Sequence, residues 1–135
     1  MVENILVKEY RVEGAVIIRA LIDVGIPVKA AFWSYYGLYE RWDFYIVSPW
    51  VDEKGLNTTY SVIGDAISEN NEIELLSLTD IRLIGIKENY YKLYLNAEKN
   101  HQQSLNTPKE CIPISGPDYQ YYVYNLEVVK EHSIR

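Results

Sequence analysis

The sequence predicts an α/β (α+β) fold, in which a mixed β-sheet is packed with about three helices in the order α-β-β-α-β-α-β. A β-hairpin pattern runs through residues 27–51, and all three tryptophans lie in or beside it. After the hairpin, segments with helical spacing alternate with strand-like segments, which is typical of a sheet with helices against it. The chain has 135 residues, of which 48% are hydrophobic, so we expect a single domain over residues 1–135 with its own core.

The hairpin is predicted to consist of two strands, Pro27–Tyr36 and Arg41–Pro49, joined by the turn Gly37–Glu40. β-branched and aromatic residues dominate both strands, as on a pleated, half-buried surface. A turn of even length pairs residues whose numbers add up to an odd value, and a one-residue slip would exchange the two faces. The odd-sum register brings the large apolar side chains to the face expected to meet the main core: Trp33, Tyr35, Trp42, Phe44 and Ile46. The other face keeps apolar residues too, so we expect it to be partly covered.

A helix is predicted directly before the hairpin, over Val12–Val24. Apolar residues recur in this segment at three- and four-residue spacing, which is the period of an amphipathic helix. Gly25 suits the position after the last helical turn, and Pro27 prevents the helix from continuing. Residues 1–12 fit either an earlier helical turn or a short strand at Ile5–Val7.

The segment after the hairpin begins with a predicted charged turn over residues 51–55. The next helix is predicted over Asn57–Glu69, with Asn57 or Thr58 as its N-terminal cap. An apolar connection then leads to a short strand, Ile81–Ile86, which we expect to be buried on both faces.

The last third of the chain holds the remaining predicted elements. Glu88–Lys99 has the apolar spacing of a third helix. Asn100–Asp118 is polar and interrupted by three prolines, so we predict a long loop in which Cys111–Ile114 touches the sheet edge. Tyr119–Val129 is the predicted last strand, and residues 130–135 form a frayed tail. Six side chains from these elements are expected to be strongly buried: Leu21, Trp33, Phe44, Ile46, Ile63 and Ile81.

Charge and composition disfavour several classes of partner. The net charge is −6, and no run of Lys or Arg supplies the basic face that nucleic-acid binding usually needs. No segment approaches the roughly 20 apolar residues of a membrane span, and residues 1–10 do not resemble a signal peptide. We therefore expect no membrane contact and a cytoplasmic location. The single cysteine, Cys111, is expected to be a small semi-buried residue in a reducing compartment.

Sequence motifs for common chemistries are missing. The chain has no glycine-rich phosphate loop, no dinucleotide fingerprint and no nucleophile elbow. Its two histidines, His101 and His132, lie in polar stretches without a neighbour at metal-ligand spacing, so we expect both to be solvated. We therefore expect no cofactor and no metal, and the pattern favours a protein that is not an enzyme.

One acidic group nevertheless suggests a catalytic alternative. Asp43 lies in the second hairpin strand, and Asp52 and Lys54 follow that strand. Metal-dependent nucleases bind a divalent cation with two acidic groups while a lysine stabilises the attacking water. Along one extended strand, however, the two aspartates would be roughly 30 Å apart. A solvated turn before a helix explains the same residues without chemistry.

Tyrosine is the other unusual feature, with 13 residues in the chain. Tyrosines can simply fill strand faces, or they can form a contact surface that offers large area with a polar group. The last strand is aromatic on both faces and poor in charge, which at a sheet edge invites pairing with another chain. We therefore predict a homodimer through this strand, with four interface residues: Tyr119, Tyr121, Tyr122 and Tyr124.

Parts of the chain resemble a family of short bacterial proteins without assigned activity. The resemblance rests on the run Ala20–Trp33, on Trp42–Gly55 and on the closing segment Tyr122–Leu126. It covers the first half of the chain and the final strand. The resemblance implies a stand-alone single domain and identifies no catalytic residue.

These observations rank three functions. The first is a small non-enzymatic cytoplasmic accessory domain that works through protein contacts, either with a partner protein or with itself. The second is a metal-dependent nuclease or hydrolase that uses Asp43, Asp52 and Lys54. The third is an acidic inhibitor that mimics nucleic acid, which would need a surface row of Asp and Glu that the sequence does not show.

Overall fold

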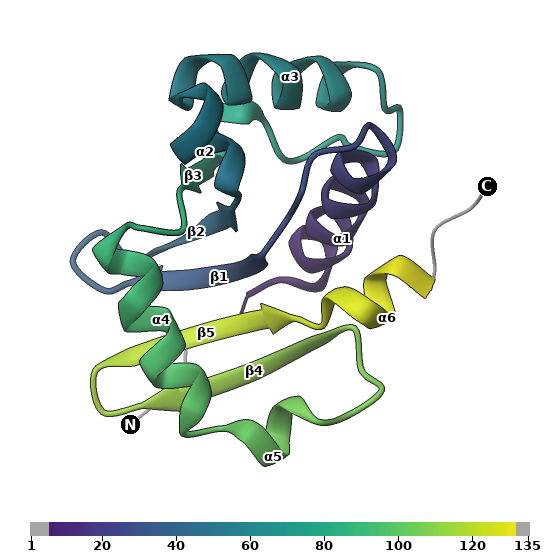
Figure 1. Ribbon diagram of the computed structural model, residues 1–135. Helices are drawn as coiled ribbons and strands as arrows, with labels where there is room; N and C mark the ends of the chain where they lie inside the picture. The colour runs from purple at the N-terminus through teal and green to yellow at the C-terminus, as the bar shows by residue number, and fades with distance from the viewer. Residues whose placement is uncertain (1–5, 132–135) are drawn as a thin grey trace.

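One mixed β-sheet organises the part of the chain that the computed structural model describes, residues 6–131. Its five strands are β1 (Ala30–Tyr36), β2 (Arg41–Val47), β3 (Ile81–Ile84), β4 (Cys111–Gly116) and β5 (Tyr119–Tyr124). They lie in the order β3-β2-β1-β5-β4 (Figure 1). β2 and β3 are parallel, and the other neighbouring pairs are antiparallel. The predicted α+β class with a mixed sheet is therefore confirmed.

The described residues form six α-helices rather than about three. They are α1 (Lys8–Asp23), α2 (Pro49–Lys54), α3 (Leu56–Ser68), α4 (Asn89–Lys99), α5 (Gln102–Leu105) and α6 (Leu126–Glu131), with a 3-10 turn, η1 (Leu78–Asp80), before β3. α1, α3 and α4 correspond to the three predicted helices. None of the helices within residues 6–131 has the length and apolar character needed to cross a membrane.

The hairpin has the predicted odd-sum register. Trp33 pairs with Phe44, and Tyr35 pairs with Trp42. Side chains alternate between the two faces of a strand, so this register directs the tryptophans to one face and Phe32, Ser34 and Tyr45 to the other. The choice of register from the apolar pattern is confirmed.

Each face of the sheet carries its own core, as Figure 1 shows for α1 and α3 on one side and α4 on the other. On the first face, Ile17 of α1 and Ile63 of α3 pack with Trp33 and Phe44. On the second face, Tyr94 of α4 stacks on Phe32 with ring centroids 4.0 Å apart. The six residues expected in the core are confirmed, because none exposes more than 2% of its surface: Leu21, Trp33, Phe44, Ile46, Ile63 and Ile81.

The end of α1 explains how the chain turns into the hairpin. The Gly25 amide donates to the Ile22 carbonyl at 3.1 Å, and the Ile26 amide donates to the Leu21 carbonyl at 2.9 Å. This pair of bonds is the Schellman pattern, which needs a left-handed residue, and Gly25 has a φ of 91°. Ile26 then folds back into the core with 1% of its surface exposed. The predicted stop is confirmed, although α1 begins at Lys8 instead of Val12.

The predicted charged turn after β2 is wrong, because this segment is the short helix α2. The Ser48 hydroxyl accepts a hydrogen bond from the Trp50 amide at 3.2 Å, and Pro49 occupies the first helical position. α3 begins one residue after Gly55, so the predicted caps at Asn57 and Thr58 are wrong too. Thr59 instead donates its hydroxyl proton to the Gly55 carbonyl at 2.8 Å.

The C-terminal predictions need two corrections. The expected loop Asn100–Asp118 contains α5 and β4, and the expected strand Tyr119–Val129 ends at Tyr124. Asn125 then starts α6, because its Oδ1 accepts a hydrogen bond from the Glu127 amide at 3.2 Å. The predicted frayed tail includes two residues of α6, and its residues 132–135 lie outside the described part, as do residues 1–5.

The register generates a stability prediction. Phe44→Ala should lower the free energy of unfolding by about 3–5 kcal/mol, because it empties a fully buried site between Trp33 and Tyr124. Urea unfolding followed by circular dichroism measures the change. Leu93→Ala, at a position of α4 that is 60% exposed, is the control and should stay within about 0.5 kcal/mol of wild type. Equal effects of the two substitutions would contradict the register.

Candidate functional site

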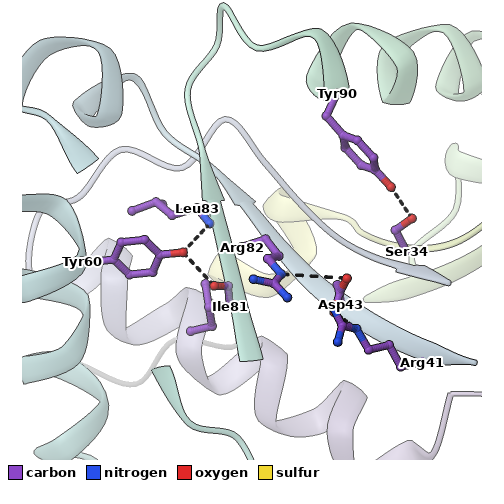
Figure 2. A network of polar contacts seen from close by, with 8 residues as sticks. All are labelled: Ser34, Arg41, Asp43, Tyr60, Ile81, Arg82, Leu83 and Tyr90. Carbon is purple, nitrogen blue, oxygen red and sulfur yellow. Dashed lines mark hydrogen bonds and ion pairs between the residues drawn. The ribbon is translucent and has the colours of Figure 1, made fainter. Parts of the chain in front are cut away.

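The three residues of the catalytic alternative have separate partners. Asp43, at the start of β2, forms ion pairs with Arg41 at 3.1 Å and with Arg82 of β3 at 3.9 Å (Figure 2). Asp52, in α2 beyond the other end of β2, accepts a hydrogen bond from the Ile86 amide at 2.9 Å. The structure therefore places the two aspartates at opposite ends of β2.

Lys54 also has a partner of its own. Its Nζ lies 4.0 Å from the centre of the Trp50 ring, which is a cation–π contact within α2. Among residues 6–131, no group of three or more His, Cys, Asp or Glu side chains could hold a metal ion. Asp43 is thus held by ion pairs, Asp52 by a backbone amide and Lys54 by an aromatic ring, and all three contacts are structural.

The tyrosines of the last strand lie inside the sheet, so the premise of edge pairing is wrong. β5 is hydrogen-bonded to β1 on one side and to β4 on the other. Tyr121, Tyr122 and Tyr124 are buried. Tyr119 is partly covered, and its hydroxyl lies 3.0 Å from Nε2 of His101, which is half-buried rather than solvated. The sequence did not reveal that β5 lies inside the sheet, because the neighbouring strand β4 falls in the proline-rich segment that was predicted to be a loop.

The buried hydroxyl of Tyr124 links three elements. It accepts a hydrogen bond from the Trp33 indole at 2.9 Å and donates one to the Arg11 carbonyl at 2.6 Å. A Cβ atom at Gly14 would overlap this hydroxyl, so only glycine allows α1 to approach so closely. Burial raises the pKa of Tyr124 well above its ordinary value. This tyrosine therefore has a structural role.

Burial also disfavours the thiolate form of the single cysteine. Cys111, at the start of β4, is half-buried as expected. Desolvation raises the pKa of its thiol to about 12, and the nearby Arg11 opposes this only in part. Because the thiolate is the nucleophilic form, the raised pKa disfavours a catalytic role for Cys111.

One open edge of the sheet, β3, is capped by a side chain. The Tyr60 hydroxyl of α3 donates to the Ile81 carbonyl at 2.8 Å and accepts from the Leu83 amide at 3.1 Å, as Figure 2 shows. These two backbone groups point away from β2, where an added strand would bind. Tyr60 therefore takes the place of a neighbouring strand and protects this edge from pairing.

The other edge, β4, is weakened by a proline. The Asn125 amide donates to the Glu110 carbonyl at 2.8 Å, so the backbone groups of residue 110 point towards β5. The backbone N–H and C=O groups of successive residues in a strand point to alternate sides. Those of Cys111, Pro113 and Ser115 therefore point away from β5, to the side where a further strand could pair. Pro113 has no amide proton, so a partner strand would lose a hydrogen bond there.

Three of the exposed large apolar side chains lie together at the end of the hairpin: Tyr36, Leu38 and Tyr39. They expose 45%, 76% and 64% of their surfaces, respectively. The rings of Tyr36 and Tyr39 stack with centroids 5.1 Å apart. Arg41 lies 5.4 Å from the centre of the Tyr39 ring while its Nε pairs with Asp43. We call Tyr36, Leu38 and Tyr39 the hairpin end. The ion pair between Arg41 and Asp43, both in β2, holds the guanidinium that contacts the Tyr39 ring.

Comparison with known proteins identifies no relative of this chain. The chain matches no protein-family model, no curated protein and no solved structure. The resemblance to a bacterial family therefore stays an expectation, and the function has to be argued from the geometry alone.

The edge cap can be tested by removing one oxygen atom. Tyr60→Phe should lower the free energy of unfolding by about 1 kcal/mol, because the Ile81 carbonyl and the Leu83 amide lose their bonding partner. The Leu83 amide should also exchange faster with deuterated solvent in NMR spectra. Tyr36→Phe, at the exposed hairpin end, is the matched control and should change neither quantity. Unchanged Leu83 exchange in Tyr60→Phe would show that the hydroxyl does not cap the edge.

Proposed function

We propose that this protein is a non-enzymatic accessory protein that works through protein contact, and that the hairpin end is its contact surface. The observation that carries the proposal is the exposure of Tyr36, Leu38 and Tyr39 together at one place. Tyrosine rings already fixed by stacking lose little entropy on binding and offer both apolar area and a hydroxyl. The proposal keeps the cytoplasmic setting that the sequence favours.

A second copy of the chain is the partner that this surface fits best. Most soluble oligomers are two-fold dimers, in which the same patch meets itself. The three side chains of the hairpin end are uncharged, so a two-fold contact would not bring like charges of these side chains together. The patch is small compared with a standard interface, which supports weak association in the micromolar range.

The other candidate functions receive less support from the geometry. The nuclease alternative needs Asp43, Asp52 and Lys54 at one place, whereas each has a different partner. Neither that alternative nor an acidic inhibitor is favoured by a particular contact among the described residues.

Light scattering of three proteins tests the proposed contact. Leu38→Asp should keep the mass at 15.7 kDa up to near-millimolar concentration, whereas the wild-type mass should rise, because the substitution places a charge in the contact. Leu93→Asp is the matched control, since it adds the same charge at an exposed leucine of α4. It should associate like wild type.

Two results would contradict the proposal. A wild-type mass of 15.7 kDa at all concentrations would remove the second copy as the partner. Equal association of Leu38→Asp and wild type would move the interface away from the hairpin end.

A further inference from the structure

A groove of about 300 Å³ opens beside the hairpin, on the face of the sheet opposite Asp43. Aromatic rings from three parts of the chain line it: Tyr10 of α1, Trp33 of β1 and Trp42 of β2. Trp33, Leu6 and Leu76 lie beneath its surface, with 2%, 3% and 5% of their surfaces exposed, so Tyr10 and Trp42 supply its accessible rings. We call this cavity the hairpin groove. Its volume lies at the lower end of the range for small-ligand sites.

The aromatic walls of the hairpin groove are held by neighbouring rings. Tyr10 meets Trp33 edge to face, with centroids 6.1 Å apart. Trp42 contacts Tyr122 with a centroid separation of 5.2 Å. Tyr122 in turn has the guanidinium of Arg11 5.1 Å from its ring centre, so this face of the sheet already holds one cation against an aromatic ring.

Two carboxylates supply negative charge at the groove. Glu40 is exposed and takes part in no ion pair within residues 6–131. Asp80 is oriented by the Ser77 amide, which donates to its Oδ2 at 2.9 Å. Arg41 also borders the groove, but its Nε is directed to Asp43, whose side chain points to the other face. Among the residues that line the groove, two carboxylates therefore stand against one guanidinium, that of Arg41.

We propose that the hairpin groove binds an organic ammonium group carried on a short apolar stem. A cation over an aromatic face is attracted by the ring quadrupole, and nearby carboxylates add to this attraction. The apolar stem would lie against the accessible ring surface of Tyr10 and Trp42, which a bare metal ion could not use. This site lies on the opposite face from the Asp43 side chain and does not rest on the proposed contact through the hairpin end.

Titration with matched small molecules tests the charge requirement. Choline should change the tryptophan fluorescence saturably and shift the NMR signal of the Trp42 indole. Dimethylbutanol, the uncharged carbon isostere of choline, should bind at least tenfold more weakly, because it fills the same volume without the charge. A third titration with N-acetyl-lysine amide separates the sources. Binding comparable to choline assigns the groove to a lysine side chain, and much weaker binding assigns it to a free quaternary ammonium compound.

Three variants locate the binding. Trp42→Leu should weaken choline binding about tenfold, which corresponds to about 1.4 kcal/mol. Glu40→Gln changes an exposed side chain and should weaken binding severalfold without affecting the fold. Glu53→Gln, which removes the same charge from the exposed side of α2, is the control and should bind choline like wild type.

Three outcomes would overturn the inference. If none of the titrations changes the fluorescence or the NMR signal, the groove binds no ammonium group. Equal binding of choline and dimethylbutanol would show that the hairpin groove binds apolar groups and does not recognise the positive charge. Equal weakening by Glu40→Gln and Glu53→Gln would show that only the overall charge of the protein attracts the cation.

Discussion

The pairing of Trp33 with Phe44 is the constraint on which the rest of the structure depends. Side chains alternate along a strand, so this one register decides what each face of the sheet presents. It gives α1 and α3 a face of tryptophan and phenylalanine, and it gives α4 the face with Phe32. It also separates the Asp43 ion pairs from the groove at Trp42. A slip by one residue would exchange these sets and leave Asp43 in the main core.

The same sheet shows how tyrosine can be abundant without marking a binding site. In β5 the tyrosines are buried, and the Tyr124 hydroxyl holds α1 against the hairpin. Tyr60 uses its hydroxyl to cap the backbone of β3. Because Tyr60 caps one sheet edge and Pro113 weakens the other, neither edge favours strand pairing, and we place the proposed contact at the exposed hairpin end.

The sequence was sufficient for the features that depend on local pattern. Apolar spacing located α1, α3, α4 and the hairpin, and the preference for a buried apolar face selected the register. The elements it missed, such as α2, α5 and β4, are only four to six residues long and depend on tertiary contacts. Three prolines suggested a loop at β4, although an edge strand tolerates Pro113. The contact was predicted on β5 and not at the hairpin end because the sequence did not reveal β4, the strand that pairs with the outer side of β5.

We propose that contact with another protein uses the hairpin end and not the last strand. NMR amide spectra recorded from low micromolar to near-millimolar concentration test it most directly, since they report each residue separately. We expect concentration-dependent shifts concentrated at residues 36–41, with the amides of Tyr121 and Tyr122 unchanged. Shifts concentrated at Tyr119–Tyr124, with the hairpin end unaffected, would contradict it.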